Sequence, residues 1–339
     1  MKNPSPTAYR ATQHLYCVAL AFFTFLLLFA GGMVTSTNSG LSVPDWPTTF
    51  GKNMFLFPPS MMKGGIFYEH GHRLFASLVG LLTLINCAAF WIWDKRNWLR
   101  WTGVVAIVLV IIQGVLGGLT VKFKLPMVVS VAHACTAELF FMLTLFMAFV
   151  SSKSFSTIGP NHFRLKHREQ IFSLLFCLFI FVQILVGAVM RHSYAGLAIP
   201  TFPMAFGQIV PPFWNFGIVV HFLHTRIGAP LLVLSGLVTI ISVLISPRSD
   251  QTTKGLASFL AIALLVQCLL GMITVWSGKA PIPTTFHLSI GALVFGTGFL
   301  IFLITSTYEN GSEEILTPSP ISNSNNDAAQ LQNGGVVLS

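Results

Sequence analysis

The chain has 339 residues, of which 54% are hydrophobic and only 9% are charged, whereas soluble domains carry about 25% charged residues. No soluble core could absorb this much apolar surface, so the composition excludes a soluble globular protein and predicts a multi-span membrane protein. The formal net charge is +9, but Lys and Arg are spread over short loops, which excludes a nucleic-acid-binding patch and indicates a role in membrane topology. All five cysteines fall inside apolar runs, so neither a disulfide framework nor a zinc site is predicted.

Eight apolar runs of about 20 residues are each long enough to cross the hydrocarbon core of a membrane as a helix. In chain order they are 15–35, 72–93, 102–121, 128–150, 170–190, 217–246, 256–276 and 284–306. With the N-terminus inside, 11 basic residues fall in cytoplasmic segments and six in the opposite loops, although those loops are longer in total. The positive-inside rule therefore predicts that both termini lie in the cytoplasm.

The sequence contains an internal repeat. GGMVTSTNSGLSVPDWPTTFG at 31–51 aligns with GAVMRHSYAGLAIPTFPMAFG at 187–207, at a constant offset of 156 residues. Further along, QGVLGGLTV at 113–121 matches QCLLGMITV at 267–275. Because each copy holds an even number of spans, the copies are expected to be parallel and related by an axis along the membrane normal. The sequence thus predicts an all-α membrane protein made of two pseudo-symmetric four-helix bundles, N-in and C-in.

The repeat and the spans divide the chain into five predicted segments. These are a cytoplasmic N-terminus at 1–14, an N-terminal four-helix bundle at 15–150, a cytoplasmic linker at 151–169, a C-terminal four-helix bundle at 170–306 and a cytoplasmic tail at 307–339. The tail is rich in Ser, Asn, Gly and Pro, a composition typical of disordered segments.

Four histidines recur with the repeat, each a few residues into an even-numbered span: His72, His133, His224 and His287. Even-numbered spans all begin on the outer side, so the four imidazoles are expected at nearly one depth, two in each bundle. Two neutral imidazoles on facing helices can ligate a haem iron from both faces, whereas zinc would need further His, Cys or carboxylate ligands. A single membrane histidine is more often a hydrogen-bonded packing residue, but this duplicated spacing favours haem ligation.

The two halves differ beside these histidines. Glu69 lies three residues before His72, on the same helix face, where the second half has His221. This difference predicts that the first pocket carries out chemistry and the second holds a permanent redox cofactor. The alternative for Glu69 is a surface carboxylate favoured by the dipole of a helix N-terminus. His70 is a weak candidate, because residues two apart do not share a helix face.

Two arginines flank the predicted ligands. Arg73 and Arg226 are candidates for pairing with haem propionates, because a guanidinium group matches a carboxylate bidentately. Their positions differ, since Thr225 rather than Arg226 aligns with Arg73. Glu138 follows the second histidine by five residues, and a structural hydrogen bond is its expected role.

The run GGMVTSTNSGLSVPDWP, the ExxHR element at 69–73 and His133, His224 and His287 together resemble the haem A synthase family, over roughly residues 15–306. The resemblance implies oxidation of the C8 methyl group of haem O to the formyl group of haem A by successive hydroxylations, for supply to cytochrome c oxidase. It also implies a bacterial cell membrane location, with the haem sites toward the outer side. A cysteine pair that many bacterial relatives carry in outer loops is not present here.

The same resemblance implies roles for individual residues. His72 and His133 would face the iron of haem O, Glu69 would serve in catalysis, and His224 and His287 would ligate a haem b cofactor. Haem O is then the substrate and a haem O synthase the expected partner, with a homo-oligomer left open.

Two other functions fit the histidine pattern and the spans less well. A dihaem b-type electron carrier would need histidine pairs at both membrane depths, whereas all four histidines here are expected near the outer side. A transporter built from parallel repeats would show broken helices and polar groups near mid-membrane, whereas these spans are nearly uninterrupted.

Overall fold

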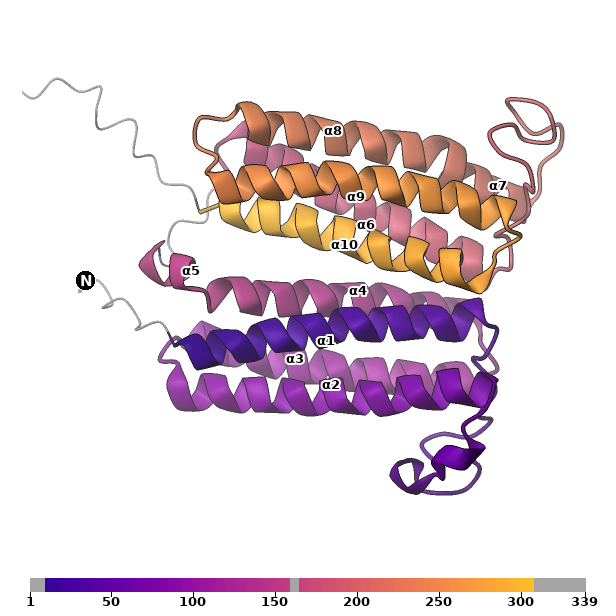
Figure 1. Ribbon diagram of the computed structural model, residues 1–339, viewed down its shortest axis with the longest axis horizontal. Coiled ribbons are helices and arrows are strands. Elements are labelled where there is room, and N and C mark those ends of the chain that lie inside the picture. The colour runs from indigo at the N-terminus through magenta and orange to yellow at the C-terminus, as the bar shows by residue number, and fades with distance from the viewer. Residues whose placement is uncertain (1–9, 159–164, 308–339) are drawn as a thin grey trace, which may run out of the picture. The chain divides into compact units, whose positions relative to one another are not determined.

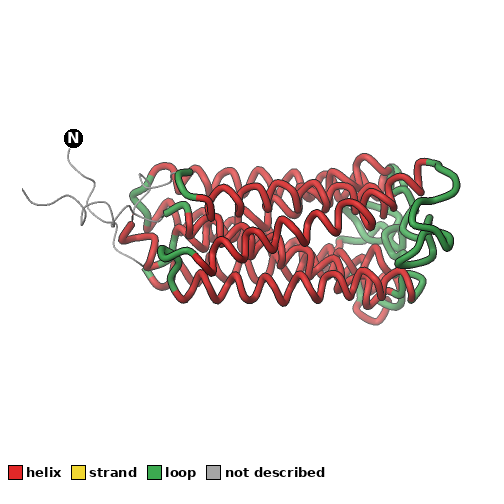
Figure 2. The backbone as a smooth tube through the Cα atoms, turned by 90° about the horizontal axis from the view of Figure 1, so that it is seen from above, coloured by secondary structure: helices red, strands yellow, loops and turns green. Residues whose placement is uncertain are grey.

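The computed structural model describes residues 10–158 and 165–307, and this part of the chain is built from helices and loops (Figure 2). The predicted N-terminal segment and linker fall partly outside these residues, and the predicted disordered tail lies almost wholly outside them. Eight spans in the described part are long and apolar enough to cross a membrane, which confirms the all-α, eight-span prediction. They are α1 (Ala11–Ser36), α2 (Gly65–Trp93), α3 (Asn97–Lys122), α4 (Met127–Val150), α6 (Arg168–His192), a composite sixth span, α9 (Gln251–Trp276) and α10 (Pro281–Thr305).

The sixth span consists of three consecutive pieces: α7 (Phe216–Phe222), the π-helix η4 (Leu223–Gly228) and α8 (Ala229–Ile245). The sequence predicted a regular helix here, so the π-helical turn is a departure from expectation. The shorter elements are two 3₁₀ turns, η1 (Met54–Leu56) and η2 (Pro59–Met61), and the helix α5 (Lys153–Ile158).

The eight spans pack as two groups of four, and Figure 1 shows the two groups side by side. In the first group α1 packs on α2, α2 on α3, α3 on α4, and α4 on α1. In the second, α6, α8, α9 and α10 close a ring in the same manner. The groups meet where α1 and α4 pack against α6 and α10. We call them the first and second bundles.

The helix starts follow local capping chemistry. Asn215 accepts a hydrogen bond from the backbone N–H of Ile218 at the start of α7, and Asp250 does the same for Thr253 at the start of α9. Such side chains satisfy backbone donors that the first turn of a helix leaves unpaired. α10 begins with Pro281, whose fixed φ suits a first helical position.

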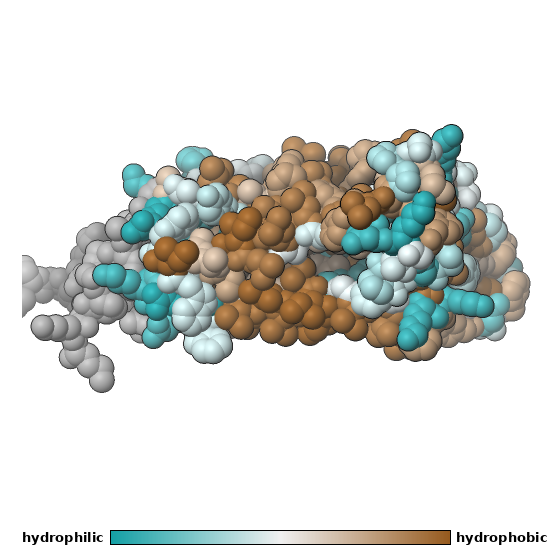
Figure 3. Space-filling model, turned by 90° about the horizontal axis from the view of Figure 1, so that it is seen from below, coloured by the Kyte–Doolittle hydropathy of each residue, from teal (hydrophilic) through white to brown (hydrophobic). Residues whose placement is uncertain are grey.

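Two long loops, residues 37–64 and 193–215, lie at the same end of the bundles (Figures 1 and 2). We call this the long-loop end and the opposite one the terminal end. Figure 3 shows hydrophobic residues concentrated in the middle of the visible face and hydrophilic residues toward both ends, as expected for spans that cross a membrane.

Three helices are joined at the terminal end through Asp94, which follows α2. Its carboxylate accepts hydrogen bonds from Gln13 of α1 at 3.1 Å and from Arg96 Nη2 at 2.8 Å. Arg96 in turn donates to the backbone carbonyl of Val150 in α4 at 3.1 Å. Burial alone would raise the pKa of Asp94, but the hydrogen bonds and charge of Arg96, with the bond from Gln13, lower it below its ordinary value.

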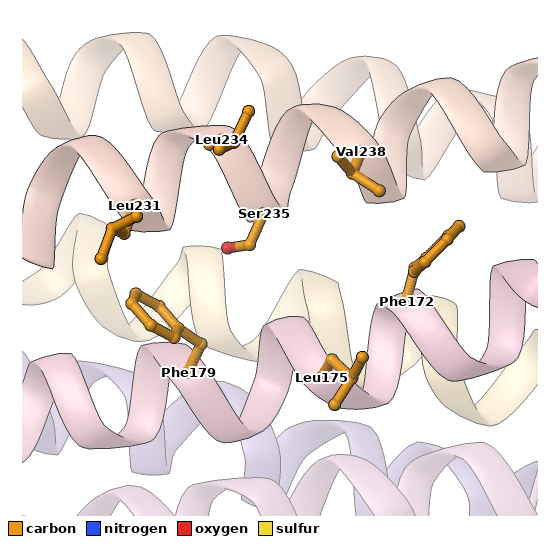
Figure 4. Close-up of a pocket in the computed structure, with 7 residues that line it drawn as sticks. All are labelled: Phe172, Leu175, Phe179, Leu231, Leu234, Ser235 and Val238. Carbon is orange, nitrogen blue, oxygen red and sulfur yellow. The ribbon is translucent and has the colours of Figure 1, made fainter.

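A groove of about 310 Å³ runs between α6 and α8 (Figure 4). Its lining residues are Phe172, Leu175, Phe179, Leu231, Leu234, Ser235 and Val238. The hydroxyl group of Ser235 donates to the backbone carbonyl of Leu232, and no titratable side chain lines the groove. The surface is therefore suited to contact with lipid acyl chains and has no groups for catalysis.

Candidate functional site

The four sequence-predicted histidines lie on α2, α4, η4 and α10, all near the long-loop end. Each is six to eight residues after the first residue of its span, which corresponds to a depth of about 9–12 Å along the helix. His72 and His133 belong to the first bundle, and His224 and His287 belong to the second. The structure thus brings the histidines to similar depths, two in each bundle.

Each histidine ring packs against a glycine of the preceding helix in its bundle. The pairs are His72 with Gly31, His133 with Gly117, His224 with Gly187 and His287 with Gly271. A methyl group added at these glycines would lie 2.8–3.3 Å from the ring Cε1 atom, closer than most real contacts. Sequence analysis missed these glycines as site residues, although they are aligned across the two copies of the repeat.

The second pair of histidines has a spacing that would suit two ligands of one metal ion. The ring centroids of His224 and His287 are 6.5 Å apart, and the ring planes are nearly perpendicular at 85°. Two imidazole nitrogens bound to one metal ion at about 2.0–2.1 Å place their ring centroids roughly 6 Å apart. The observed separation therefore fits an iron atom between the two rings.

The hydrogen bonds around the histidines leave their Nε2 atoms available. His287 Nδ1 lies 3.2 Å from the backbone carbonyl of Gln267, and the side-chain amide of Gln113 lies 3.1 Å from His133 Nδ1. Within the described residues no hydrogen bond reaches the Nε2 atom of any of the four histidines. Metal-binding histidines commonly use Nδ1 for such a second contact and Nε2 for the metal.

Glu69 and His221 anchor equivalent loops in the two bundles. Glu69 Oε2 accepts a hydrogen bond from the backbone N–H of Val43 at 2.8 Å, and His221 Nδ1 accepts one from Ile199 at 3.3 Å. Val43 and Ile199 are aligned in the repeat, and both anchoring side chains are buried. Glu69 also forms an ion pair with Arg73, so the first bundle has a charged pair where the second has a neutral anchor.

Arg73 holds the first long loop against α2. Its Nη1 donates to the carbonyl groups of Asp45 at 2.8 Å and Thr48 at 3.2 Å, while Nη2 donates to Val43 at 3.0 Å and to Glu69. The guanidinium group therefore fixes the loop against α2 at the residue that follows His72.

Arg226 makes the equivalent contacts in the second bundle, with the carbonyl groups of Thr201 at 2.9 Å and Met204 at 3.4 Å. These residues align with Asp45 and Thr48. Arg226 reaches them because the π-helix η4 accommodates one additional residue after the histidine. Its Nε and Nη1 atoms are buried and have no partner within the described residues, and pairing of the two arginines with haem propionates stays a prediction.

The tips of both loops return to the third helix of their own bundle. The ring of Trp46 lies so close to Gly118 that a methyl group there would be 2.5 Å from the ring, next to the glycine that supports His133. In the second bundle the carbonyl group of Phe202, aligned with Trp46, accepts from Trp276 Nε1 at 3.3 Å. Each long loop therefore spans the end of its bundle from α2 or η4 across to α3 or α9.

Asp45 stabilises the first loop from within. Its carboxylate accepts hydrogen bonds from the hydroxyl group of Thr48 and from the backbone N–H groups of Phe50 and Gly51. Desolvation alone would raise the pKa of Asp45, but these three bonds outweigh it and lower the pKa below its ordinary value. The second loop has Thr201 at this position, whose hydroxyl accepts from Phe206 instead.

Two other candidates lie away from the histidine pairs. His70 is fully buried, with Nδ1 3.0 Å from the hydroxyl group of Thr49 and its ring against Phe57, so it packs under the loop rather than beside His72. Glu138 Oε2 is buried without a partner in the described part of the chain. The hydrogen bond expected for Glu138 is not found in that part of the chain.

Comparison with known proteins identifies the family. The model of the family COX15-CtaA, described as cytochrome oxidase assembly protein, matches residues 14–299. The chain belongs to this family. The resemblance to haem A synthases that the sequence motifs indicate is thereby confirmed.

Curated relatives in this family include a protein named heme A synthase from Shouchella clausii, 29% identical over 83% of this chain and 93% of its own length. The heme A synthase of Alkalihalophilus pseudofirmus is 26% identical over 86% of this chain and 97% of its own. The heme A synthase of Orientia tsutsugamushi is 22% identical over 84% of this chain and 94% of its own length. These similarities extend over both bundles and not over a single motif.

Proposed function

We propose that this protein is a haem A synthase, which oxidises the C8 methyl group of haem O to a formyl group. The spacing of His224 and His287, which fits one iron atom, supports this function most directly. The names of the relatives support it independently. Two hydroxylations, each taking an oxygen atom from water and passing two electrons to an external acceptor, would give a geminal diol, which loses water to form the aldehyde.

The two bundles would bind different haems and have different roles. His224 and His287 would hold a haem b, which when bound supplies one-electron redox chemistry. His72 and His133 would hold the substrate haem O, with the loop 37–64 restricting access of water to the pocket. The proposal includes a pseudo-symmetric arrangement of the two bundles and a topology with both termini inside. It also includes a location in a bacterial cell membrane and a haem O synthase as the source of the substrate.

Glu69 would be the catalytic carboxylate of the first bundle. It is buried three residues before His72 in α2 and forms an ion pair with Arg73, so the first bundle has a carboxylate at the position where the second has His221. A fixed carboxylate next to the reacting methyl group could stabilise developing positive charge or receive a proton.

The test uses two substitutions in membranes that co-express the protein with a haem O synthase, followed by extraction and chromatography of the non-covalent haems. Glu69→Gln keeps an acceptor for Val43 but removes the charge. Glu69→His installs the loop anchor that the second bundle uses. We expect a haem A peak with the wild-type protein and its loss in both variants, while bound haem is retained.

Retention of haem A formation in Glu69→His would assign Glu69 to loop anchoring alone. A wild-type protein that binds haem but forms no haem A would instead favour the dihaem electron carrier.

A further inference from the structure

Arg191 is a cation within a membrane-spanning helix that has no carboxylate partner in the described part of the chain. It is the penultimate residue of α6, and its side chain is partly buried. The ion pairs found among the described residues are Arg73–Glu69 and Arg96–Asp94, neither of which involves it. A charge in such a position is costly unless an opposite charge or hydrogen bonds compensate it.

The side chain of Arg191 turns into the bundle instead of extending toward the helix end. Its Nη2 atom donates to the hydroxyl groups of Thr35 and Ser36, the latter at 3.0 Å, and to the backbone carbonyl of Gly32 at 3.4 Å. All three residues belong to α1 of the first bundle, and Gly32 lies a full turn deeper than Ser36. Helical side chains generally point toward the N-terminus of their helix. The N-terminus of α6 lies at the terminal end, so the direction of the Arg191 side chain is the usual one.

The contact with Thr35 places Arg191 at the boundary between the bundles. Arg191 occupies, in the second copy of the repeat, the position that Thr35 occupies in the first. Equivalent residues of two copies touch each other only close to the axis that relates the copies. The guanidinium group therefore lies where α1 of the first bundle meets α6 of the second.

Arg191 faces the second pair most directly. Gly187 lies four residues earlier on the same face of α6, and this is the glycine against which His224 packs. Ser36, to which Arg191 donates, also accepts a hydrogen bond at 3.0 Å from Thr285 of α10, two residues before His287. Arg191 thus lies on the long-loop side of the pair formed by His224 and His287.

The guanidinium group of Arg191 has hydrogen-bond donors that are not used by the contacts with α1. Its Nη2 atom makes all the hydrogen bonds found in the described residues, so Nε and Nη1 have no partner there. A guanidinium group presents its donors as a planar fork that matches a carboxylate. A haem carries two propionate carboxylates on one edge, so a haem between His224 and His287 would bring the missing negative charge.

We propose that Arg191 binds a propionate carboxylate of the haem held by His224 and His287. The inference rests on the proposed haem-binding function and adds a binding residue that orients the propionate edge of this haem toward the long-loop end. Arg191 would also connect that carboxylate to α1 of the other bundle through its hydrogen bonds with Thr35 and Ser36.

The experiment compares purified holoprotein of the wild type with Arg191→Gln, Arg191→Lys and the matched control Lys122→Gln. Lys122 is an exposed cation at the same end of α3, so its substitution removes the same charge without touching the pocket. Two properties are measured: the resonance Raman band of the haem propionate bending mode, and the rate at which haem is transferred to excess apomyoglobin. The band reports hydrogen bonding to the propionate itself, which a purely structural role of Arg191 would not change.

We expect Arg191→Gln to shift the propionate band and to accelerate haem transfer about tenfold, as loss of one charge-assisted hydrogen bond would. Arg191→Lys should shift the band but retain most of the haem, and Lys122→Gln should match the wild type. A propionate band that is unchanged in both Arg191 variants, with wild-type haem content, would overturn this inference but leave the proposed function intact. A wild-type protein without bound haem would overturn the proposed function as well.

Discussion

At each of the four histidines, the chain has a glycine where a larger side chain would push the imidazole ring away. The tightest contact is that of Gly187, where an added methyl group would lie 2.8 Å from Cε1 of His224. The glycine has no chemical role of its own. Its contribution is to let the ring lie against α6 so that its position is fixed by packing.

We therefore predict that Gly187→Ala displaces His224 and lowers haem occupancy of the second bundle. Inserting a methyl group into a packed contact of this kind costs about 1–3 kcal/mol. The measurement is the haem-to-protein ratio by the pyridine haemochrome method, together with the low-spin haem signal in electron paramagnetic resonance. Gly255→Ala is the control, because nothing lies within 4 Å of the added methyl group on that part of α9. An unchanged ratio and signal in Gly187→Ala would show that the ring can accommodate the methyl group.

At the scale of the element, the π-helix η4 explains how the second bundle keeps the loop contacts of the first. The first bundle has Arg73 directly after its histidine, whereas Arg226 follows His224 by two residues. A π-helical turn holds one residue more than an α-helical turn. The residues before and after the turn therefore stay on the same helix faces as their counterparts in α2. Thr225 is then the additional residue.

Deletion of Thr225 should consequently be tolerated, because it converts the π-helical turn into a regular α-helical turn with the sequence order of the first bundle. Deletion of Leu237, in the regular part of α8, should not be tolerated. It rotates every later residue of α8 by about 100° and turns Thr239 and Ile240 away from the core. Haem content and thermal unfolding in detergent distinguish the two deletions. Equal damage from both would argue against the assignment of Thr225 as the additional residue.

The elements also show what the sequence could and could not predict. Apolar run length predicted all eight spans, and the repeat predicted that His72, His133, His224 and His287 lie at similar depths. The glycine partners of the histidines and the anchoring of Val43 by Glu69 were not predicted, because they depend on which helices become neighbours. A side chain that bonds a distant backbone group leaves no periodic pattern in the sequence.

At the scale of the whole molecule, the terminal end is joined through Asp94, and this contact makes stability depend on pH. The pKa of Asp94 is lowered in the folded protein, so its ionised form favours the folded state. This stabilisation is fully present above the ordinary aspartate pKa of 3.8 and is lost as the pH falls through the lowered value of the folded state.

We expect the thermal unfolding temperature in detergent to fall in this acidic range, and Asp94→Asn to reduce the fall. The variant should be less stable than the wild type at neutral pH, because Arg96 and Gln13 lose an ionised acceptor. Asp250→Asn, at the N-terminus of α9, is the comparison, because it retains a capping side chain. A wild-type acid profile in Asp94→Asn would assign the pH dependence to other carboxylates.

The placement of all four histidines near the long-loop end has an electrical consequence. A charge that moves along the membrane normal gains or loses about 2.3 kcal/mol per 100 mV of membrane potential. Because the two histidine pairs lie at similar depths, an electron passing between haems bound there would travel parallel to the membrane and cross almost none of this potential. Exchange between the two bundles would then neither be driven by the energised state of the membrane nor dissipate it, so the same internal redox equilibrium would hold in respiring and de-energised cells.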